Sequence, residues 1–442
     1  MGIFLKKIVS FFLPESYVER LFNPNGQKYF FHVGWNLFGR VIYLPLAFLV
    51  NVYVVRYLGP EQWGTLSYVV SFVGIFSFLA SLGVDSILYV DLVKEPENKD
   101  KLLGTAFVLK SVGSVLSFVV IMIASEIMGN SSFTTMVMAI VAASIFFQPI
   151  NIVNYFFQAK VQSKPTVISS LVISFLMAGL KIFFVYFGYS LVFFASIYLL
   201  EAILMAFGYW YIYKKSGEKI FNWSFDRKLA VEMFKYSWPL ILSSAFAMVY
   251  SRIDQVMIKH YMSETAVGFY DTAVRIAEMW YILPTIIVGS VMPAVLNAKT
   301  VSEEFYALRL KRLYSFVIYF SLIFIMPISL GSNYIISFLY GSEFFASAVV
   351  LRFYVWAGVA VLVGTVLNQY LLGEKETKVS LAINLVGMVL NVVLNIFLIP
   401  KKGLAGAAMA TMISYSIVPL TVIFFPKIRW QLSLMLKAIF IK

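Results

Sequence analysis

The chain contains no cysteine, and this absence excludes disulfides, thiolate nucleophiles and zinc–thiolate sites. Histidine is nearly missing as well, because His32 and His260 are the only two and cannot by themselves form a metal cluster. The sequence also has no phosphate-cradling Gly-Lys-Ser/Thr loop and no Ser-His-Asp set. We therefore predict that the chain is not an enzyme, that it hydrolyses no ATP and that it holds no cofactor or metal.

Charged residues are scarce, at 13% against the roughly 25% of an ordinary soluble domain. The 442 residues are instead 61% hydrophobic, with about a dozen apolar stretches of roughly 20 residues, each long enough to cross a hydrocarbon core as a helix. The segment before them lacks a cleavage site and is interpreted as a retained, amphipathic interfacial segment. The sequence predicts an all-α polytopic membrane protein with about 12 transmembrane helices, at 33–55, 63–84, 102–125, 133–157, 166–187, 190–213, 238–259, 270–296, 313–332, 345–372, 379–399 and 404–425.

Lysine and arginine lie mostly on one side of these predicted spans. With the N-terminus inside, 25 of the 35 fall in inside segments, 4 in outside loops, if Lys259 at the outer end of its span is counted with the loop, and 6 deeper within spans. This bias predicts that both termini are cytoplasmic. The formal charge of +13 then mostly faces the inner leaflet, and no nucleic-acid partner is needed to explain it.

Short stretches repeat at corresponding points of the two halves of the chain. "RYLGPEQWGTLSY" after the first span resembles "KHYMSETAVGFYD" after the seventh, and "QAKVQSKPTVIS" before the fifth resembles "LGEKETKVSLAI" before the eleventh. Parallel repeats of six helices are typical of transporters that carry substrate between the halves. We predict an N-terminal lobe at 1–215, a cytoplasmic linker at 216–237 that ends in an amphipathic stretch on the membrane, and a C-terminal lobe at 238–442.

Four motifs in this order, "RYLGPEQWGTLSY", "YSRIDQVMI…VGFYDTAVRIAEMWYILP", "FLYGSEFFASAVVLRF" and "LIPKKGLAGAAMATMISY", resemble the Wzx-type polysaccharide flippases. These flippases belong to the multidrug/oligosaccharidyl-lipid/polysaccharide exporter superfamily, which includes the MATE drug exporters. The resemblance implies a V-shaped pair of six-helix lobes in a bacterial inner (cytoplasmic) membrane. It also implies an undecaprenyl-diphosphate-linked oligosaccharide, such as an O-antigen repeat unit of lipopolysaccharide, as the substrate.

Charges within the apolar spans are the candidate functional residues, because a charge at the bilayer centre costs roughly 3 kcal/mol. Arg252 lies about 14 residues, or near 20 Å, beyond the inner end of its span and cannot easily reach the cytoplasmic surface. Asp254 is two residues away and points to a different side of the helix. Arg252 therefore either lines a cavity between the lobes or pairs with an acid on a neighbouring helix. Lys181 likewise either lines the cavity, forms an ion pair, for which Glu201 is one potential partner, or extends its long side chain toward the interface.

The other charges within the spans have simpler explanations beside the functional one. Arg40 and Lys110 lie in the inner third of the membrane and Arg352 near its outer surface, where long side chains can extend to the interface. The i, i+4 spacing of Asp271 and Arg275 predicts an internal ion pair. The candidate substrate-binding cations are Arg252, Lys181, Arg40, Lys110, Arg275 and Arg352, and the candidate ion-coupling acids are Asp254 and Glu201.

Six bases against few acids within the spans predict a cationic central cavity, which suits a diphosphate better than an organic cation. The first hypothesis is a flippase that works by alternating access, with lipid-linked oligosaccharide, membrane lipids and a polysaccharide polymerase or ligase as partners. The resemblance implies coupling to H+ or Na+. A MATE-like drug/cation antiporter is the alternative. A membrane glycosyltransferase would need an acidic motif and a long loop, and neither is found.

Overall fold

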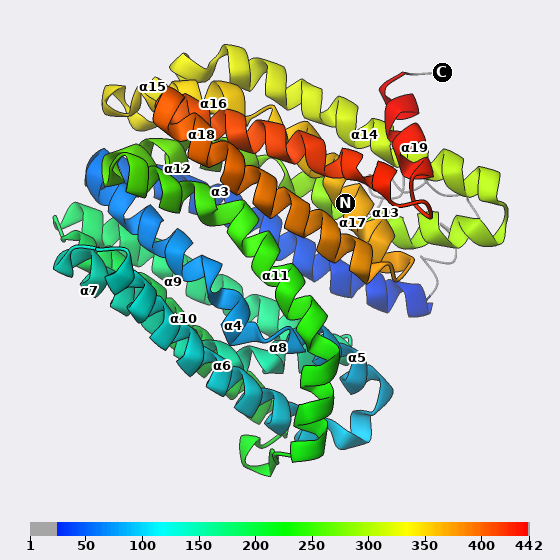
Figure 1. The fold of residues 1–442 in the computed structure, drawn as a ribbon. Helices are drawn as coiled ribbons and strands as arrows, with labels where there is room; N and C mark the ends of the chain where they lie inside the picture. Colours follow the sequence, from blue (N-terminus) through cyan, green and yellow to red (C-terminus); the bar gives the residue numbers. More distant parts are fainter. Residues whose placement is uncertain (1–23, 441–442) are drawn as a thin grey trace. The chain divides into compact units, whose positions relative to one another are not determined.

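The structure is a computed structural model, which describes the backbone of residues 24–440 and the side chains of residues 45–440. Every regular element in this part of the chain is helical (Figure 1). The chain forms two compact units, one of which contains Lys28–Val256 and the other Met257–Lys442. The predicted interfacial segment at the N-terminus lies outside the described residues.

The unit Lys28–Val256 holds the first set of helices, and α9 and α10 pack along each other within it. Its buried core draws on five helices through Val84, Leu103, Phe156, Tyr213 and Met233. The elements are α3 (Pro24–Ile75), α4 (Ser77–Ser81), α5 (Val84–Lys94), η1 (Pro96–Asn98), α6 (Lys99–Ile127), α7 (Ser132–Ala143), η2 (Ser144–Asn151), α8 (Ile152–Ala159), α9 (Lys164–Tyr186), α10 (Leu191–Lys215), η3 (Ile220–Asn222) and α11 (Arg227–Tyr261), which runs past Val256 into the second unit.

The unit Met257–Lys442 holds the second set, in which the C-terminal helix α19 packs on α14. The Tyr314 hydroxyl of α14 donates a hydrogen bond of 3.0 Å to Gln431 Oε1 of α19. The elements are α12 (Glu264–Met279), α13 (Ile282–Asn297), η4 (Ala298–Thr300), α14 (Glu303–Leu330), α15 (Ser332–Tyr340), η5 (Ser342–Phe344), α16 (Ser347–Tyr354), α17 (Ala357–Gly373), α18 (Thr377–Ile417), η6 (Val418–Phe424) and α19 (Trp430–Ile439).

The twelve membrane-spanning helices stay a prediction, because length and apolar composition alone do not separate every span. In the described part of the chain, seven helices are long and apolar enough to cross a membrane, or nine if two bent pairs each count as one span. The backbone kinks at Gly59 (φ 70°) in α3 and at Gly403 (φ 57°) in α18, each between two predicted spans, in a left-handed region that glycine adopts without steric cost. The predicted span 270–296 is divided between α12 and α13, because the helix breaks at Trp280.

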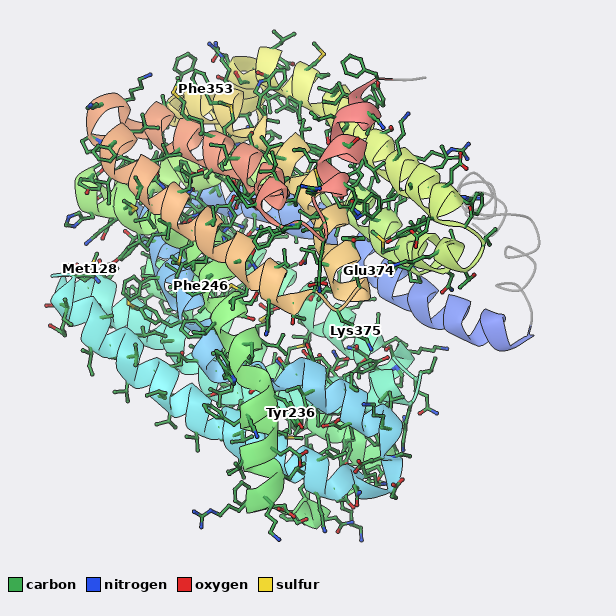
Figure 2. The ribbon with its side chains drawn as sticks, turned by 45° about the vertical axis from the view of Figure 1, so that its right-hand side comes forward. Met128, Tyr236, Phe246, Phe353, Glu374 and Lys375 are labelled. Atoms are coloured by element: carbon green, nitrogen blue, oxygen red, sulfur yellow. The ribbon has the colours of Figure 1, made fainter. Side chains whose placement is uncertain are left out.

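The second sequence repeat corresponds to a matching backbone turn in each unit. Val161 (φ 56°) lies between α8 and α9, and Lys375 (φ 60°) lies between α17 and α18, where Figure 2 labels it beside Glu374. The amide of Gln162 bonds to the carbonyl of Phe157 at 2.8 Å, and the amide 214 positions later, of Glu376, bonds to that of Leu371 at 2.8 Å. The repeat therefore extends from sequence to backbone hydrogen bonds.

Candidate functional site

Helix α11 carries the charged stretch in the middle of the chain. Arg252 is exposed and forms no ion pair with any residue whose side chain the structure describes, whereas Asp254 is buried with 4% of its surface exposed. Gln255 is also buried, and its Oε1 accepts a hydrogen bond of 2.7 Å from the Ser71 hydroxyl of α3. Helix geometry thus separates the two charges, with the base at the surface and the acid inside.

Lys110 of α6 is paired with an acid. Its side chain is only 4% exposed and forms a direct ion pair with Asp85 of α5, which is 26% exposed. The ammonium also lies 5.9 Å from the centre of the Tyr155 ring, close enough for a cation–π contact. Hydrogen bonding to the carboxylate and the aromatic face offset the cost of holding the lysine charge inside the unit.

Lys181 and Glu201 lie on the neighbouring helices α9 and α10, and the lysine charge acts electrostatically on the glutamate. Glu201 lines a cavity of about 240 Å³ together with Gln148, Asn151 and Tyr209. A carboxylate surrounded by amides and a hydroxyl can accept a proton or a small cation. This cavity lies entirely within the unit Lys28–Val256.

Two further predicted cations lie in the unit Met257–Lys442. Arg275 Nε binds Asp271 Oδ2 at 2.6 Å, which confirms the ion pair predicted from the i, i+4 spacing. Arg352 of α16 is exposed, and its Nη2 lies 3.5 Å from Asn333 Oδ1. Arg40 lies in α3, but its side chain is outside the described residues. The structure therefore engages Lys110 and Arg275 with acids and leaves Arg252 and Arg352 exposed.

Helix α18 contains a buried network of amide and hydroxyl side chains that the sequence patterns did not lead us to predict. Asn395 donates to Asn391 at 3.1 Å, and Asn391 donates to the Ser414 hydroxyl at 3.3 Å, with all three side chains fully buried. The signal was two asparagines four residues apart in an apolar run, which places both on one face. The network links the two parts of α18 on either side of Gly403.

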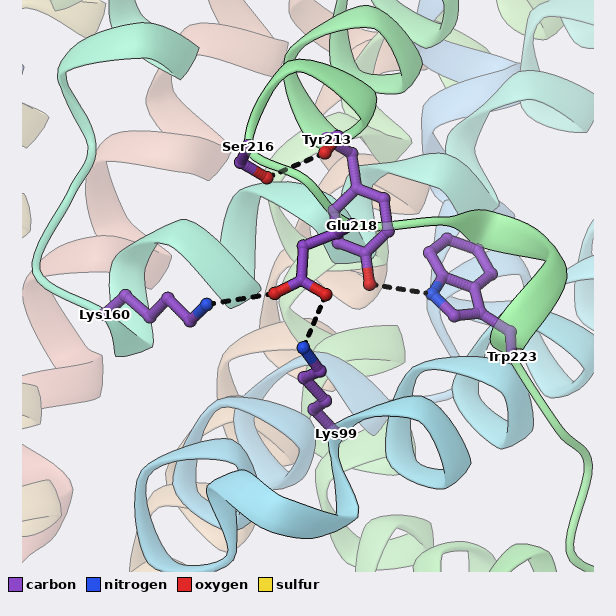
Figure 3. A network of polar contacts seen from close by, with 6 residues as sticks. All are labelled: Lys99, Lys160, Tyr213, Ser216, Glu218 and Trp223. Atoms are coloured by element: carbon purple, nitrogen blue, oxygen red, sulfur yellow. Dashed lines mark hydrogen bonds and ion pairs between the residues drawn. The ribbon is translucent and has the colours of Figure 1, made fainter.

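The predicted linker 216–237 lies within the unit Lys28–Val256, where polar contacts hold it against the helices (Figure 3). Glu218 binds Lys99 of α6 and, at 3.2 Å, Lys160 beside α8, while the Trp223 indole donates to the Tyr213 hydroxyl at 3.1 Å. Burial raises the pKa of Glu218, but the two lysine hydrogen bonds together outweigh it and hold the pKa below its usual range. The glutamate is therefore ionised at neutral pH.

The second part of the linker, which the sequence places on the membrane as an amphipathic stretch, enters a helix that continues through the apolar segment. Asp226 Oδ1 accepts hydrogen bonds from the amides of Lys228 and Leu229 at 2.8 and 3.2 Å and so caps the start of α11. Met233 of the same helix is 1% exposed and packs in the core of the unit Lys28–Val256. In the described part of the chain, no three His, Asp or Glu side chains gather as a metal site.

Comparison with known proteins identifies the family. The family model described as "Polysaccharide biosynthesis protein" matches residues 32–299, more than half of the chain, and the MatE model matches residues 239–397. A probable low-salt glycan biosynthesis flippase, Agl15 of Haloferax volcanii, is 25% identical over 43% of this chain, and the match covers only 40% of that relative. An uncharacterised membrane protein of Methanocaldococcus jannaschii, MJ1068, is 23% identical over 87% of this chain and 81% of its own length.

Among solved structures, the lipid II flippase MurJ in an inward closed conformation matches with a TM-score of 0.72 at 17% identity, over 93% of this chain and 91% of that one. This similarity shows a shared fold. The family assignment rests on the family model. Its match includes α11 and the helices that hold Lys110, Lys181 and Glu201. The chain therefore belongs to the polysaccharide biosynthesis protein family.

Proposed function

We propose that the chain moves undecaprenyl-diphosphate-linked oligosaccharide repeat units from the cytoplasmic to the outer leaflet by alternating access. The observation that carries the proposal is Arg252, an exposed arginine in an apolar helix, which pairs with no acid among the described side chains. A cation at this depth is costly unless it faces water or an anion. A guanidinium binds a phosphate through two parallel hydrogen bonds, so a diphosphate is a suitable substrate group.

We propose that the remaining cations also bind the substrate, and that exposed cations do so more readily than those already paired with an acid. Arg352 is exposed and Lys181 is half-buried, so both can contact an anionic substrate. Arg40 stays a candidate from the sequence alone, because its side chain lies outside the described residues. Lys110 and Arg275 would need to leave Asp85 and Asp271 before binding a phosphate. During the transport cycle, each of these bases would exchange its carboxylate partner for a phosphate of the substrate.

We propose Glu201 as the acid that couples transport to H+ or Na+. It lines a cavity with two amide side chains and lies near Lys181, so a change in its protonation changes the charge that this lysine meets. Asp254 is the second candidate because it is buried on the same helix as Arg252. Its carboxylate has polar or charged contacts, which a coupling ion would have to replace.

The proposal is tested by deleting the gene in its host and measuring which leaflet holds the lipid-linked repeat units. A flippase predicts their build-up on the cytoplasmic side and the loss of exported polysaccharide, both restored by the full chain. A MATE-like drug/cation antiporter is the second candidate, favoured by the MatE match at residues 239–397. Loss of drug resistance with no build-up of repeat units would select the antiporter and reject the flippase.

A further inference from the structure

Helices α9 and α10 enclose a groove that the proposed substrate contacts leave unused. Its volume is about 680 Å³, and most of its lining is apolar, with Ile168, Val172 and Phe207 among the residues. At one end the groove is lined by Lys164, the first residue of α9, and Lys215, the last residue of α10. The groove is therefore apolar along its length and cationic at one end.

The acid that lies close to Lys215 in the chain is bound by lysines outside the groove lining. Glu218 follows Lys215 by three residues, but its carboxylate is bound by Lys99 and Lys160 (Figure 3). Lys214 lies 5.3 Å from the centre of the Trp210 ring and is not part of the groove lining. The distribution of lysine and arginine along the chain assigns this end to the cytoplasmic side. An anionic headgroup at the cytoplasmic surface matches this arrangement.

The groove continues along α9 as a second hollow of about 630 Å³, which shares Val172 and Leu176 with the first and extends to Phe183. From Lys164 to Phe183 the helix rises by about 28 Å, close to the full thickness of a hydrocarbon core. The acyl chain of a phospholipid crosses only one leaflet, or about half of this length. One acyl chain therefore fills at most about half of the groove, whereas a single chain about twice as long can follow all of it.

We propose that this groove binds the polyprenyl tail of the lipid carrier, with its phosphate held between Lys164 and Lys215. The inference rests on the proposed function, because it assigns the lipid part of the same substrate to the outer face of α9 and α10. The tail would then stay in contact with the hydrocarbon phase while the sugar-bearing headgroup is moved. Burial of a long isoprenoid chain supplies affinity in proportion to its covered area.

The test is native mass spectrometry of the full chain with undecaprenyl phosphate, which carries no sugar, as the probe. We expect the wild type to retain this lipid in the presence of excess phosphatidylglycerol. Val172→Trp fills the part common to both hollows and should weaken binding about tenfold, or 1.4 kcal/mol. The matched control is Ile182→Trp, on the same helix and 45% exposed but outside both linings, and it should bind like the wild type.

The headgroup position is tested by the double variant Lys164→Gln/Lys215→Gln. Loss of two charge-assisted contacts should weaken binding by about tenfold or more. The control Lys214→Gln/Lys219→Gln removes the same charge from the same end without touching the lining and should leave binding unchanged. Equal loss in both double variants would mean a diffuse electrostatic effect and would overturn the assigned phosphate position.

Two outcomes would overturn the groove as a polyprenyl site. One is displacement of undecaprenyl phosphate by phosphatidylglycerol at equal concentration, which would make the groove an ordinary phospholipid site. The other is unchanged binding by Val172→Trp. Because the probe has no sugar and no transport is measured, the result is separate from the proposed function. A wild type that restores export but does not bind the probe rejects the groove alone, and one that binds but does not restore export rejects the flippase alone.

Discussion

Lys110 and Asp85 form an ion pair inside the unit Lys28–Val256, with the lysine side chain 4% exposed. The pair joins α6 to α5, two helices that are separated in the chain by the short η1 turn. Removal of one member leaves the other charged and poorly solvated. Removal of both leaves two neutral groups that fit an apolar surrounding.

We predict that Lys110→Met and Asp85→Asn each lower the stability of the folded chain by roughly 2 kcal/mol, which is less than a fully buried pair would lose because Asp85 is 26% exposed. The double variant should lose less than the sum of the single variants. Thermal unfolding of the detergent-solubilised chain, followed by size-exclusion fluorescence, gives the three shifts. Additive losses would show that the two side chains do not interact energetically.

Arg252 is expected to contact the substrate rather than to hold the fold. Arg252→Gln should reduce export by about tenfold while membrane yield and melting temperature stay unchanged, because no described ion pair is broken. Arg252→Lys keeps the charge but loses the bidentate fork and should fall in between. Export is measured as surface polysaccharide per amount of chain in the membrane.

The matched control for this variant is Arg227→Gln. Arg227 is an exposed arginine on the same helix, α11, at the end that precedes the apolar segment. It should export like the wild type. If Arg227→Gln and Arg252→Gln lose export equally, the effect comes from general charge on α11, and the substrate contact at Arg252 is rejected.

Much of the fold could be predicted from the length of the apolar segments and from the sequence repeat. The echo around Val161 and Lys375 predicted corresponding loops, and both positions have the same turn with the same hydrogen bonds. Breaks inside a span were not accessible in the same way. The kink at Gly403 falls between two predicted spans, but the break at Trp280 falls inside one, because it depends on local backbone geometry that hydrophobicity does not encode.

The partner of Lys110 could not be read from the sequence for a similar reason. Helical periodicity gives the face on which a lysine lies, but it does not give the neighbouring helix. Asp85 was expected just after the end of the predicted second span, yet Leu82 (φ 47°) and Gly83 (φ 61°) turn the chain there and start α5. That turn brings the carboxylate to α6. The i, i+4 pair of Asp271 and Arg275 needed no such knowledge, because both residues lie on one helix.

Val161 is a β-branched residue at φ 56°, a conformation that L-residues adopt at a cost of roughly 1 kcal/mol. Val161→Gly should therefore stabilise the folded chain by up to about 1 kcal/mol, and Lys375→Gly should act in the same direction in the other unit. The contrasting control is Val167→Gly in α9, where the backbone is helical and glycine should lower stability. A lower melting temperature for Val161→Gly would show that its side-chain packing outweighs the strain.

Glu218 gives the linker a pH-dependent contribution to stability. The lysine contacts hold its pKa below the usual range of glutamate in the folded chain. A folded pKa that is lowered contributes stability above the unfolded pKa, and this contribution is lost as the pH falls through the folded value. We predict that Glu218→Gln lowers the melting temperature at pH 7 and that its difference from the wild type shrinks on acidification to below about pH 4.

The control for Glu218 is Asp226→Asn, in which another linker carboxylate with a lowered pKa is replaced. Its pKa is lowered chiefly by the backbone amides of Leu229 and Lys228 at the start of α11, and less by the charges of Lys101 and Lys228. Lys99→Met, which removes one partner of Glu218, should reproduce the pH dependence of Glu218→Gln, whereas added salt should change Asp226→Asn less than either. If Lys99→Met melts like the wild type at pH 7, the ion pair does not fix the linker, and the packing of Trp223 on Tyr213 must do so instead.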